Sequence, residues 1–198
     1  MTGLVVGAVV LGMVWGRWFL PVSLVGHLEL VTNIALGLML VGVGIELGGK
    51  RSTWRRLRVL GWRVLLVPLA VGIGSLAGAV GAGLMLNLPF NESSAIGAGF
   101  GWYSLSGVLI AQIYDVQVGA LAFLTNVIRE LMAFMLIPVL AVKMSKLMAV
   151  APGGATTMDT TLPVISRATD ADTTIIALVN GTSLSLMVPL LVPLLISL

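Results

Sequence analysis

The chain contains no cysteine, one histidine and few charged residues, which make up 10% of its 198 positions. Without cysteine it can form no disulfide bond and no thiolate metal site, and one histidine cannot build a usual catalytic metal centre. The sequence also lacks a nucleophile elbow, so we expect no enzyme activity, no metal and no organic cofactor. Its net charge of +3 is concentrated in loops, which argues against nucleic acid binding.

Hydrophobic residues dominate what remains. They make up 58% of the chain, and the mean hydropathy is +1.09. These values predict an all-α integral membrane protein that contacts lipid rather than a soluble domain. No long polar stretch divides the chain, so we expect one transmembrane domain over residues 1–198. The first apolar segment lacks the basic start of a secretory signal, and we expect it to be retained.

Five apolar segments have the length of about 20 residues that a spanning helix needs. They cover residues 4–20, 28–47, 64–86, 118–142 and 173–198. Two further segments, residues 94–114 and 147–166, are long enough but are interrupted by glycine, proline or hydroxyl residues. We therefore predict about five transmembrane helices plus two re-entrant or discontinuous helical hairpins.

Basic residues predict the orientation. Six lysines and arginines, without an acid, lie between Lys50 and Arg63, and such loops are cytoplasmic. The span 64–86 then runs outward. If the segment 94–114 enters from the external side and returns to it, the span 118–142 runs inward and places Lys143 and Lys146 in the cytoplasm. The segment 147–166 then enters from the cytoplasm and returns to it, so the two hairpins enter the membrane from opposite faces. This predicts a protein of the cytoplasmic (plasma) membrane with a cytoplasmic N-terminus and an external C-terminus.

Ionised side chains interrupt one predicted span. Arg129 and Glu130 lie in the apolar run 118–142, and charged residues at such depth are costly and are usually kept for function. A second acid, Asp159, lies in the broken segment 147–166. Irregular backbone at membrane depth requires cover from protein or a wet cavity. We therefore predict that Glu130 and Asp159 form one polar site in such a cavity.

Helix geometry suggests roles for the neighbouring residues. Asn126 lies one turn before Glu130 and shares its face, so both are expected to line the cavity and to bind substrate or protons. Arg129 points about 100° away, and it could neutralise an acid across the seam or bind a substrate carboxylate. Other side chains offer aromatic, hydroxyl or amide groups to the cavity. These are Trp102, Tyr103, Ser104, Ser106, Thr156, Thr157, Thr160 and Asn180.

Several of these polar residues also have structural interpretations. For Arg129 the residues favour structural pairing over substrate binding, whereas Trp102 and Tyr103 suit packing or an aromatic belt as well as they suit a substrate contact. Asn180 is of a type that often joins packed membrane helices. Asp170 and Asp172 precede the last predicted span, and we predict that they are N-caps without a part in transport.

Three motifs, in order, resemble the LysO family of lysine exporters. They are GFGWYSLSG at residues 99–107, REL at 129–131 with LIP at 136–138, and GATTMDTTLPV at 154–164. The resemblance covers nearly the whole chain. It implies a secondary transporter that exports L-lysine and basic analogues, and the paired intramembrane acids of the family map onto Glu130 and Asp159. Because lysine leaves as a cation, we predict proton antiport, with H⁺ rather than Na⁺ as coupling ion.

Members of that family are typically longer, with further helices ahead of the part that this chain resembles. We therefore expect a homo-oligomer, or a small separate membrane subunit that supplies those helices. Two other functions stay open at this point. One is a sodium or sodium/proton-coupled carrier of another solute, and the other is a non-transporting membrane subunit that completes the fold of a partner.

Overall fold

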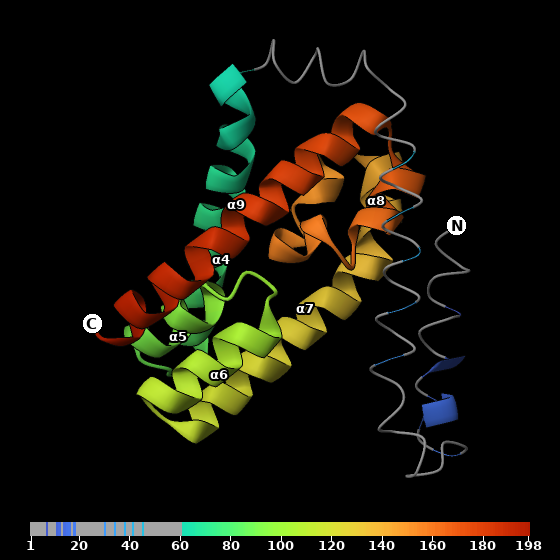
Figure 1. The fold of residues 1–198 in the computed structure, drawn as a ribbon. Coiled ribbons are helices and arrows are strands. Elements are labelled where there is room, and N and C mark those ends of the chain that lie inside the picture. The colour runs from blue at the N-terminus through green and yellow to red at the C-terminus, as the bar shows by residue number, and fades with distance from the viewer. Residues whose placement is uncertain are drawn as a thin grey trace.

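The computed structural model describes residues 61–198 without a gap and, before them, only scattered positions between 7 and 45 (Figure 1). Apart from those scattered positions, the predicted spans 4–20 and 28–47 lie outside the described residues, as does the predicted place of the N-terminus. Residues 61–198 contain helices and no strand, which agrees with an all-helical protein. The elements are η1 (Gly61–Leu65), α4 (Leu66–Met85), α5 (Phe90–Gly97), α6 (Tyr103–Ile113), α7 (Val116–Lys143), η2 (Met148–Val150), η3 (Gly154–Met158), α8 (Leu162–Ala168) and α9 (Ala171–Ile196).

Three helices within residues 61–198 are long and apolar enough to cross a bilayer. They are α4, α7 and α9, and they coincide with the predicted spans 64–86, 118–142 and 173–198. The chain is thus a multi-pass membrane protein, while the total of five spans stays a prediction. Prolines inside α7 and α9 do not end these helices, because neighbouring helices can satisfy the freed backbone groups.

Helix α9 lies at the centre of the described part. Within its most apolar 18 residues 44% are buried, against 17% for α4 and 22% for α7. It crosses α4 and runs opposite to α7 (Figure 1). Its buried face includes Ile175, Leu184 and Val188, which contribute to two hydrophobic clusters. The outward faces of α4 and α7 instead expose large apolar side chains such as Leu69, Ile73 and Leu124, as lipid contact requires.

The first broken segment consists of α5, a tight break and α6. At the break Phe100 has φ 49° and Gly101 has φ 99°, so two successive residues adopt left-handed backbone and reverse the chain. The Tyr114 hydroxyl, just after α6, donates to Glu92 Oε1 in α5 over 3.1 Å. The segment therefore begins and ends on the same side of the fold.

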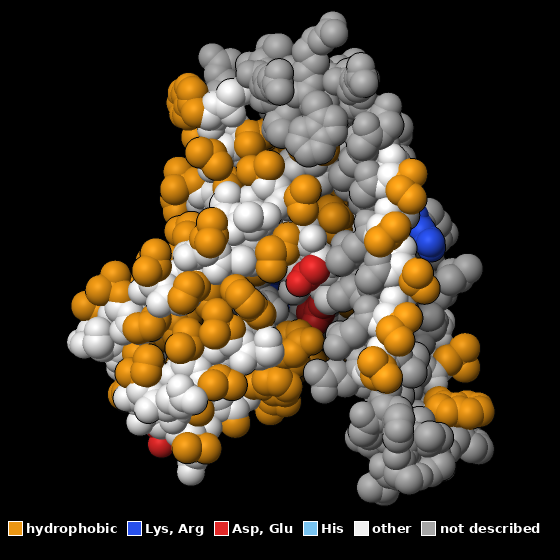
Figure 2. Space-filling model, viewed as in Figure 1, with side chains coloured by type: hydrophobic (Ala, Val, Ile, Leu, Met, Phe, Trp, Pro, Cys, Tyr) orange, Lys and Arg blue, Asp and Glu red, His pale blue; other side chains and the backbone are white. Residues whose placement is uncertain are grey.

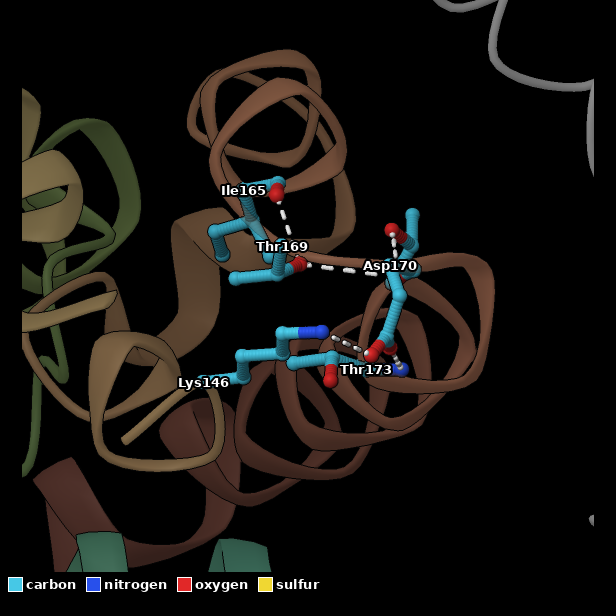
Figure 3. A network of polar contacts seen from close by, with 6 residues as sticks. Lys146, Ile165, Thr169, Asp170 and Thr173 are labelled. Atoms are coloured by element: carbon cyan, nitrogen blue, oxygen red, sulfur yellow. Dashed lines mark hydrogen bonds and ion pairs between the residues drawn. The ribbon is translucent and has the colours of Figure 1, made fainter. Parts of the chain in front are cut away.

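The second broken segment consists of η2, η3 and α8. Lys146, before η2, forms an ion pair of 2.9 Å with Asp170, after α8, so this segment also begins and ends on one side (Figure 3). Asp170 is the N-cap of α9 and accepts from the Thr173 amide over 2.8 Å, as predicted. Asp172 lies within the first turn of α9 instead, so its predicted N-cap role is wrong: the helix begins one residue before it.

The tips of the two broken segments meet beside α7. The Ala155 amide donates to Phe100 O over 2.8 Å and joins the two breaks directly. Helix α6 packs on the N-terminal part of α7, where Gly107 and Gly119 allow close approach. The second segment packs on the C-terminal part, around Ile137 (Figure 1). The two segments thus approach from opposite ends of α7, while their re-entrance into a bilayer stays a prediction.

Candidate functional site

One threonine joins the two acids that the sequence singles out. The Thr160 hydroxyl donates to Glu130 Oε1, and the Thr160 amide donates to Asp159 Oδ1 over 2.6 Å. Glu130 comes from the middle of α7, and Asp159 follows η3 directly, where the backbone leaves the 3₁₀ turn. Both acids are half-buried. The structure therefore brings Glu130 and Asp159 together, although their role in binding stays a prediction.

Few charged side chains lie on the face of the molecule that Figure 2 shows, where acidic side chains stand among mostly hydrophobic or uncharged ones. Tyr103, at the start of α6, interacts electrostatically with both Glu130 and Asp159. Its ring meets Phe123 of α7 edge-on, with the centroids 5.4 Å apart. Tyr103 is thus the predicted aromatic residue that the structure places at the acids.

The other residues predicted around Tyr103 are placed differently. Trp102 is half-buried and packs against the core cluster around Phe100. Ser104 is exposed. Ser106 is buried, and its hydroxyl donates to Trp102 O over 2.9 Å, one turn back in α6. None of these three has a hydrogen bond to Glu130 or Asp159 in the part of the chain that the structure describes.

Asn126 holds the first break together. Its Oδ1 accepts from the Gly101 amide over 2.7 Å, and its Nδ2 donates to Ala122 O over 2.9 Å and to Ile96 O over 3.3 Å. The side chain is only 2% exposed. This differs from the expected place on a cavity wall beside Glu130, because the buried backbone of the break engages the whole amide.

Arg129 contacts oxygen atoms that carry no charge. Its Nη1 donates to Ser75 Oγ over 2.6 Å, its Nε to Pro152 O over 3.1 Å, and its Nη2 to Ala151 O over 3.5 Å. The expectation that Arg129 neutralises an acid across the seam is therefore not met within residues 61–198. The turn of the helix aims Glu130 at Thr160 and aims Arg129 at the carbonyls that precede η3.

Sequence reasoning missed Ser75 as a member of this polar network. Ser75 lies in α4, and its hydroxyl both accepts from Arg129 and donates to Gly97 O over 3.1 Å. The available signal was weak, since Ser75 is the only hydroxyl residue in an otherwise apolar helix rich in glycine and alanine. Such residues often form hydrogen bonds between membrane helices, but the sequence does not show with which partner.

Most hydroxyls of the second break serve its own backbone. Thr156 donates to Gly153 O over 2.8 Å and also contacts the Thr161 hydroxyl. The Thr157 hydroxyl shares its one proton between Gly154 O, at 2.8 Å, and Ala177 O in α9, at 2.7 Å. Both threonines are buried, so of the predicted hydroxyl residues in this segment only Thr160 bonds to the acid pair.

Asn180 supports the second break from α9. Its Nδ2 donates to Gly154 O over 2.9 Å and to Thr157 Oγ1 over 3.0 Å, and the residue is fully buried. Its Oδ1 is buried without a hydrogen-bond partner in the described part of the chain. A Cβ on the next residue, Gly181, would overlap the Met158 amide. Asn180 therefore fits the interpretation as a helix-packing residue.

Two recesses lie beside Arg129 and not beside the acids. One, of about 540 Å³, is lined mainly by apolar residues of α4, α7 and η2, with Ser75 and Arg129 among them. The other, of about 340 Å³, is also lined by Arg129 and Pro152 and includes Thr125. Within residues 61–198 no group of three acids or histidines could hold a metal.

Comparison with known proteins gives consistent results. A family model described as Lysine exporter LysO matches residues 6–196. Lysine exporter LysO of Escherichia coli K12 is 39% identical over 186 residues, which are 94% of this chain and 61% of that protein. A Haemophilus influenzae protein that carries a provisional lysine-exporter name is 31% identical over 185 residues, 93% of this chain and 92% of that protein. No solved structure matches the chain.

The two relatives differ in length. The chain spans less than two thirds of the Escherichia coli relative, as expected from a resemblance to longer proteins. It spans nearly all of the Haemophilus influenzae relative. Additional helices are thus not a feature of every relative, and the predicted need for a partner that supplies them stays a prediction.

Proposed function

The chain belongs to the lysine exporter LysO family, and on that premise we propose that it exports L-lysine and close basic analogues across the cytoplasmic membrane. One observation in the structure supports this proposal most. Glu130 and Asp159, from different segments, share Thr160 at the place where two broken segments meet. Two carboxylates suit a substrate with a net positive charge, and acids at membrane depth commonly mark substrate and proton pathways.

The charge of lysine makes export costly without coupling. At a membrane potential of about 100 mV, negative inside, moving one positive charge outward costs roughly 2.3 kcal/mol before any concentration gradient. We propose proton antiport as the solution. A carboxylate that holds either the lysine ammonium or a proton exchanges one for the other, so one proton inward cancels the charge of one lysine outward. The pH gradient then drives export.

The residues take distinct parts in this exchange. Glu130 and Asp159 hold the substrate ammonium or the proton, and Thr160 keeps the two carboxylates facing one site. Tyr103 contacts the substrate cation, because it is the aromatic residue near both acids. The interrupted backbone at the two tips offers peptide groups to the α-carboxylate and α-ammonium of the substrate.

Exchange of labelled lysine in proteoliposomes tests the acid pair. Glu130→Gln and Asp159→Asn keep the shape of each side chain and remove its charge. Since a hydrogen bond to a charged group contributes about 1.5–3 kcal/mol, we expect each change to lower exchange by about 10- to 100-fold. Glu92→Gln is the matched control, because the new side-chain amide can still accept from Tyr114 outside the site. Exchange that is unaffected by both site variants would refute the proposal.

The same vesicles separate the alternatives. Lysine flux with an imposed pH gradient should exceed flux without one, and equal fluxes would rule out proton antiport. A sodium dependence that survives the removal of lysine would favour a sodium-coupled carrier of another solute. If the purified chain moves lysine only after a second membrane subunit is added, the chain is one part of a hetero-oligomer. A mass measurement in native lipid distinguishes that case from a homo-oligomer.

A further inference from the structure

Arg129 is a half-buried cation near the midpoint of α7. Its guanidinium bonds to Ser75 Oγ and to the carbonyls of Ala151 and Pro152, and to no acid within residues 61–198. A guanidinium at this depth is expensive unless its donors are satisfied. Neutral oxygens accept from each of its three nitrogens, and the adjacent Glu130 accepts from Thr160 instead.

Arg129 fastens the second broken segment to α7. Ala151 and Pro152 belong to the turn between η2 and η3, only a few residues before Asp159. Gly154 lets the guanidinium come close, since a Cβ there would lie 2.8 Å from Nη2 and would also overlap Phe100 O. The planar guanidinium, with its fixed set of donors, holds this turn in one orientation.

Ser75 extends the same connection to the first broken segment. Its hydroxyl accepts from Arg129 Nη1 and donates to the carbonyl of Gly97, the last residue of α5. Gly97 packs closely on α4, because a Cβ there would lie 2.5 Å from the Ala79 Cβ. Arg129 thus reaches one break directly and the other through a single hydroxyl.

We propose that Arg129 is a positioning residue for the acid pair, and that Ser75 links it to the first break. By holding the turn before η3 against α7, Arg129 sets where Asp159 and Thr160 lie relative to Glu130. It takes neither substrate nor proton. The transport part of the test rests on the proposed function, whereas the geometric part does not.

The absence of cysteine allows a direct geometric test. Spin labels on Leu124→Cys in α7 and Leu147→Cys before η2 report how the second segment sits on α7, and both positions are exposed. We expect Arg129→Gln to broaden the distribution of distances between the labels and Ser75→Ala to broaden it less. Arg167→Gln, which removes an exposed cation from α8, should leave it unchanged. A distribution as narrow in Arg129→Gln as in the unsubstituted chain overturns the proposal.

Transport kinetics separate positioning from substrate binding. We expect Arg129→Gln to lower the maximal rate per folded molecule by about tenfold, and Ser75→Ala by about threefold, in line with the loss of one or two hydrogen bonds. The KM for lysine should change by less than about twofold, since neither residue touches substrate in this proposal. A higher KM at an unchanged maximal rate would show that Arg129 binds substrate and would overturn the proposal.

The effects of Arg129→Gln and Ser75→Ala on the maximal rate should not be independent. Because both act through one chain of hydrogen bonds, the double variant should be no slower than Arg129→Gln alone, and independent, multiplying effects would contradict the link through Ser75. Arg129→Lys keeps the charge without the planar fork and should recover only part of the rate. If the unsubstituted chain moves no lysine, the proposed function fails, and the label distances still decide whether Arg129 positions the second segment.

Discussion

The two broken segments differ in how they are built and in what they carry. The first consists of regular helices, α5 and α6, around a break at residues 98–102 that contains no ionisable side chain. The second consists mostly of short 3₁₀ turns and carries Asp159 and Thr160 at its tip. The first segment therefore contributes packed helices, and the second contributes the charged and polar side chains.

Each break is held by a different kind of side chain. In the first, the amide of Asn126 satisfies backbone donors and acceptors at once, in a fully buried place. In the second, Arg129 from α7 and Asn180 from α9 donate only to carbonyls and hydroxyls. This comparison shows that a neutral amide, which both donates and accepts, suits a break with unpaired amides and carbonyls. A guanidinium, which only donates, suits a break that presents carbonyls.

Gly154→Ala should have the largest effect, because it acts where the two breaks touch. Gly154 has φ 58°, and an added Cβ would overlap Phe100 O and crowd Arg129. Left-handed strain and overpacking together should lower the free energy of unfolding by about 3 kcal/mol or more. Thermal unfolding of the purified protein in detergent measures this.

Gly78→Ala is the matched control for that prediction. Gly78 lies in α4, and nothing lies within 4 Å of the place of an added Cβ. Alanine is the better helix former, so we expect an unchanged or slightly higher stability, by up to about 1 kcal/mol. Equal stabilities for Gly154→Ala and Gly78→Ala would show that the two tips do not touch as described.

The two buried asparagines should differ in their contribution to stability. Asn126→Leu leaves the buried Gly101 amide without its partner, which should cost about 2–3 kcal/mol, whereas the Ile96 carbonyl still accepts from the Gly99 amide. Asn180→Leu should cost only about 1 kcal/mol, because Thr157 still donates to Gly154 O and the unpaired Oδ1 is removed. A larger loss for Asn180→Leu in the same unfolding measurement would mean that the second break depends more on its amide than the first.

The contacts that close the two segments should have the smallest effects. At Asp170, burial raises the pKa, but the Thr173 amide and Lys146 lower it more, to about 2 from an ordinary 3.8. Because the folded pKa is the lower one, Asp170 stabilises the fold above pH about 4 and loses this effect as the pH falls toward 2. Asp170→Ala should therefore cost about 1 kcal/mol at pH 7, mainly through the lost N-cap, since the ion pair is exposed.

The free energy of unfolding, measured from pH 7 down to pH 2, tests the direction of this pH dependence. The difference in that free energy between the unsubstituted chain and Asp170→Ala should shrink as the pH falls, and a difference that grows would contradict the prediction.

Tyr114→Phe breaks the exposed contact to Glu92 that closes the first segment. It should change stability at pH 7 by less than about 0.5 kcal/mol.

Much of the fold could be predicted from the sequence, because hydrophobic length is a local property. The runs 64–86, 118–142 and 173–198 predicted α4, α7 and α9 within a few residues, and glycine and proline marked the two interrupted segments. That Glu130 and Asp159 share one polar site could also be expected, since ionisable groups at membrane depth need polar or wet surroundings. The partners of Asn126, Arg129 and Ser75 could not, because helix periodicity gives the direction of a side chain but not what lies opposite it.

The sequence by itself determined that this is a helical membrane protein with two interrupted segments and ionisable groups at depth, since bilayer thickness and the cost of buried charge leave few alternatives. Only the tertiary structure decided that Thr160 joins Glu130 to Asp159, that Asn126 belongs to the first break and that Arg129 reaches both. Hydrogen bonds between segments distant in the chain depend on how helices cross and where a backbone turns. Helix crossings and backbone turns are set by the packing of the whole chain, and no single segment of the sequence determines them.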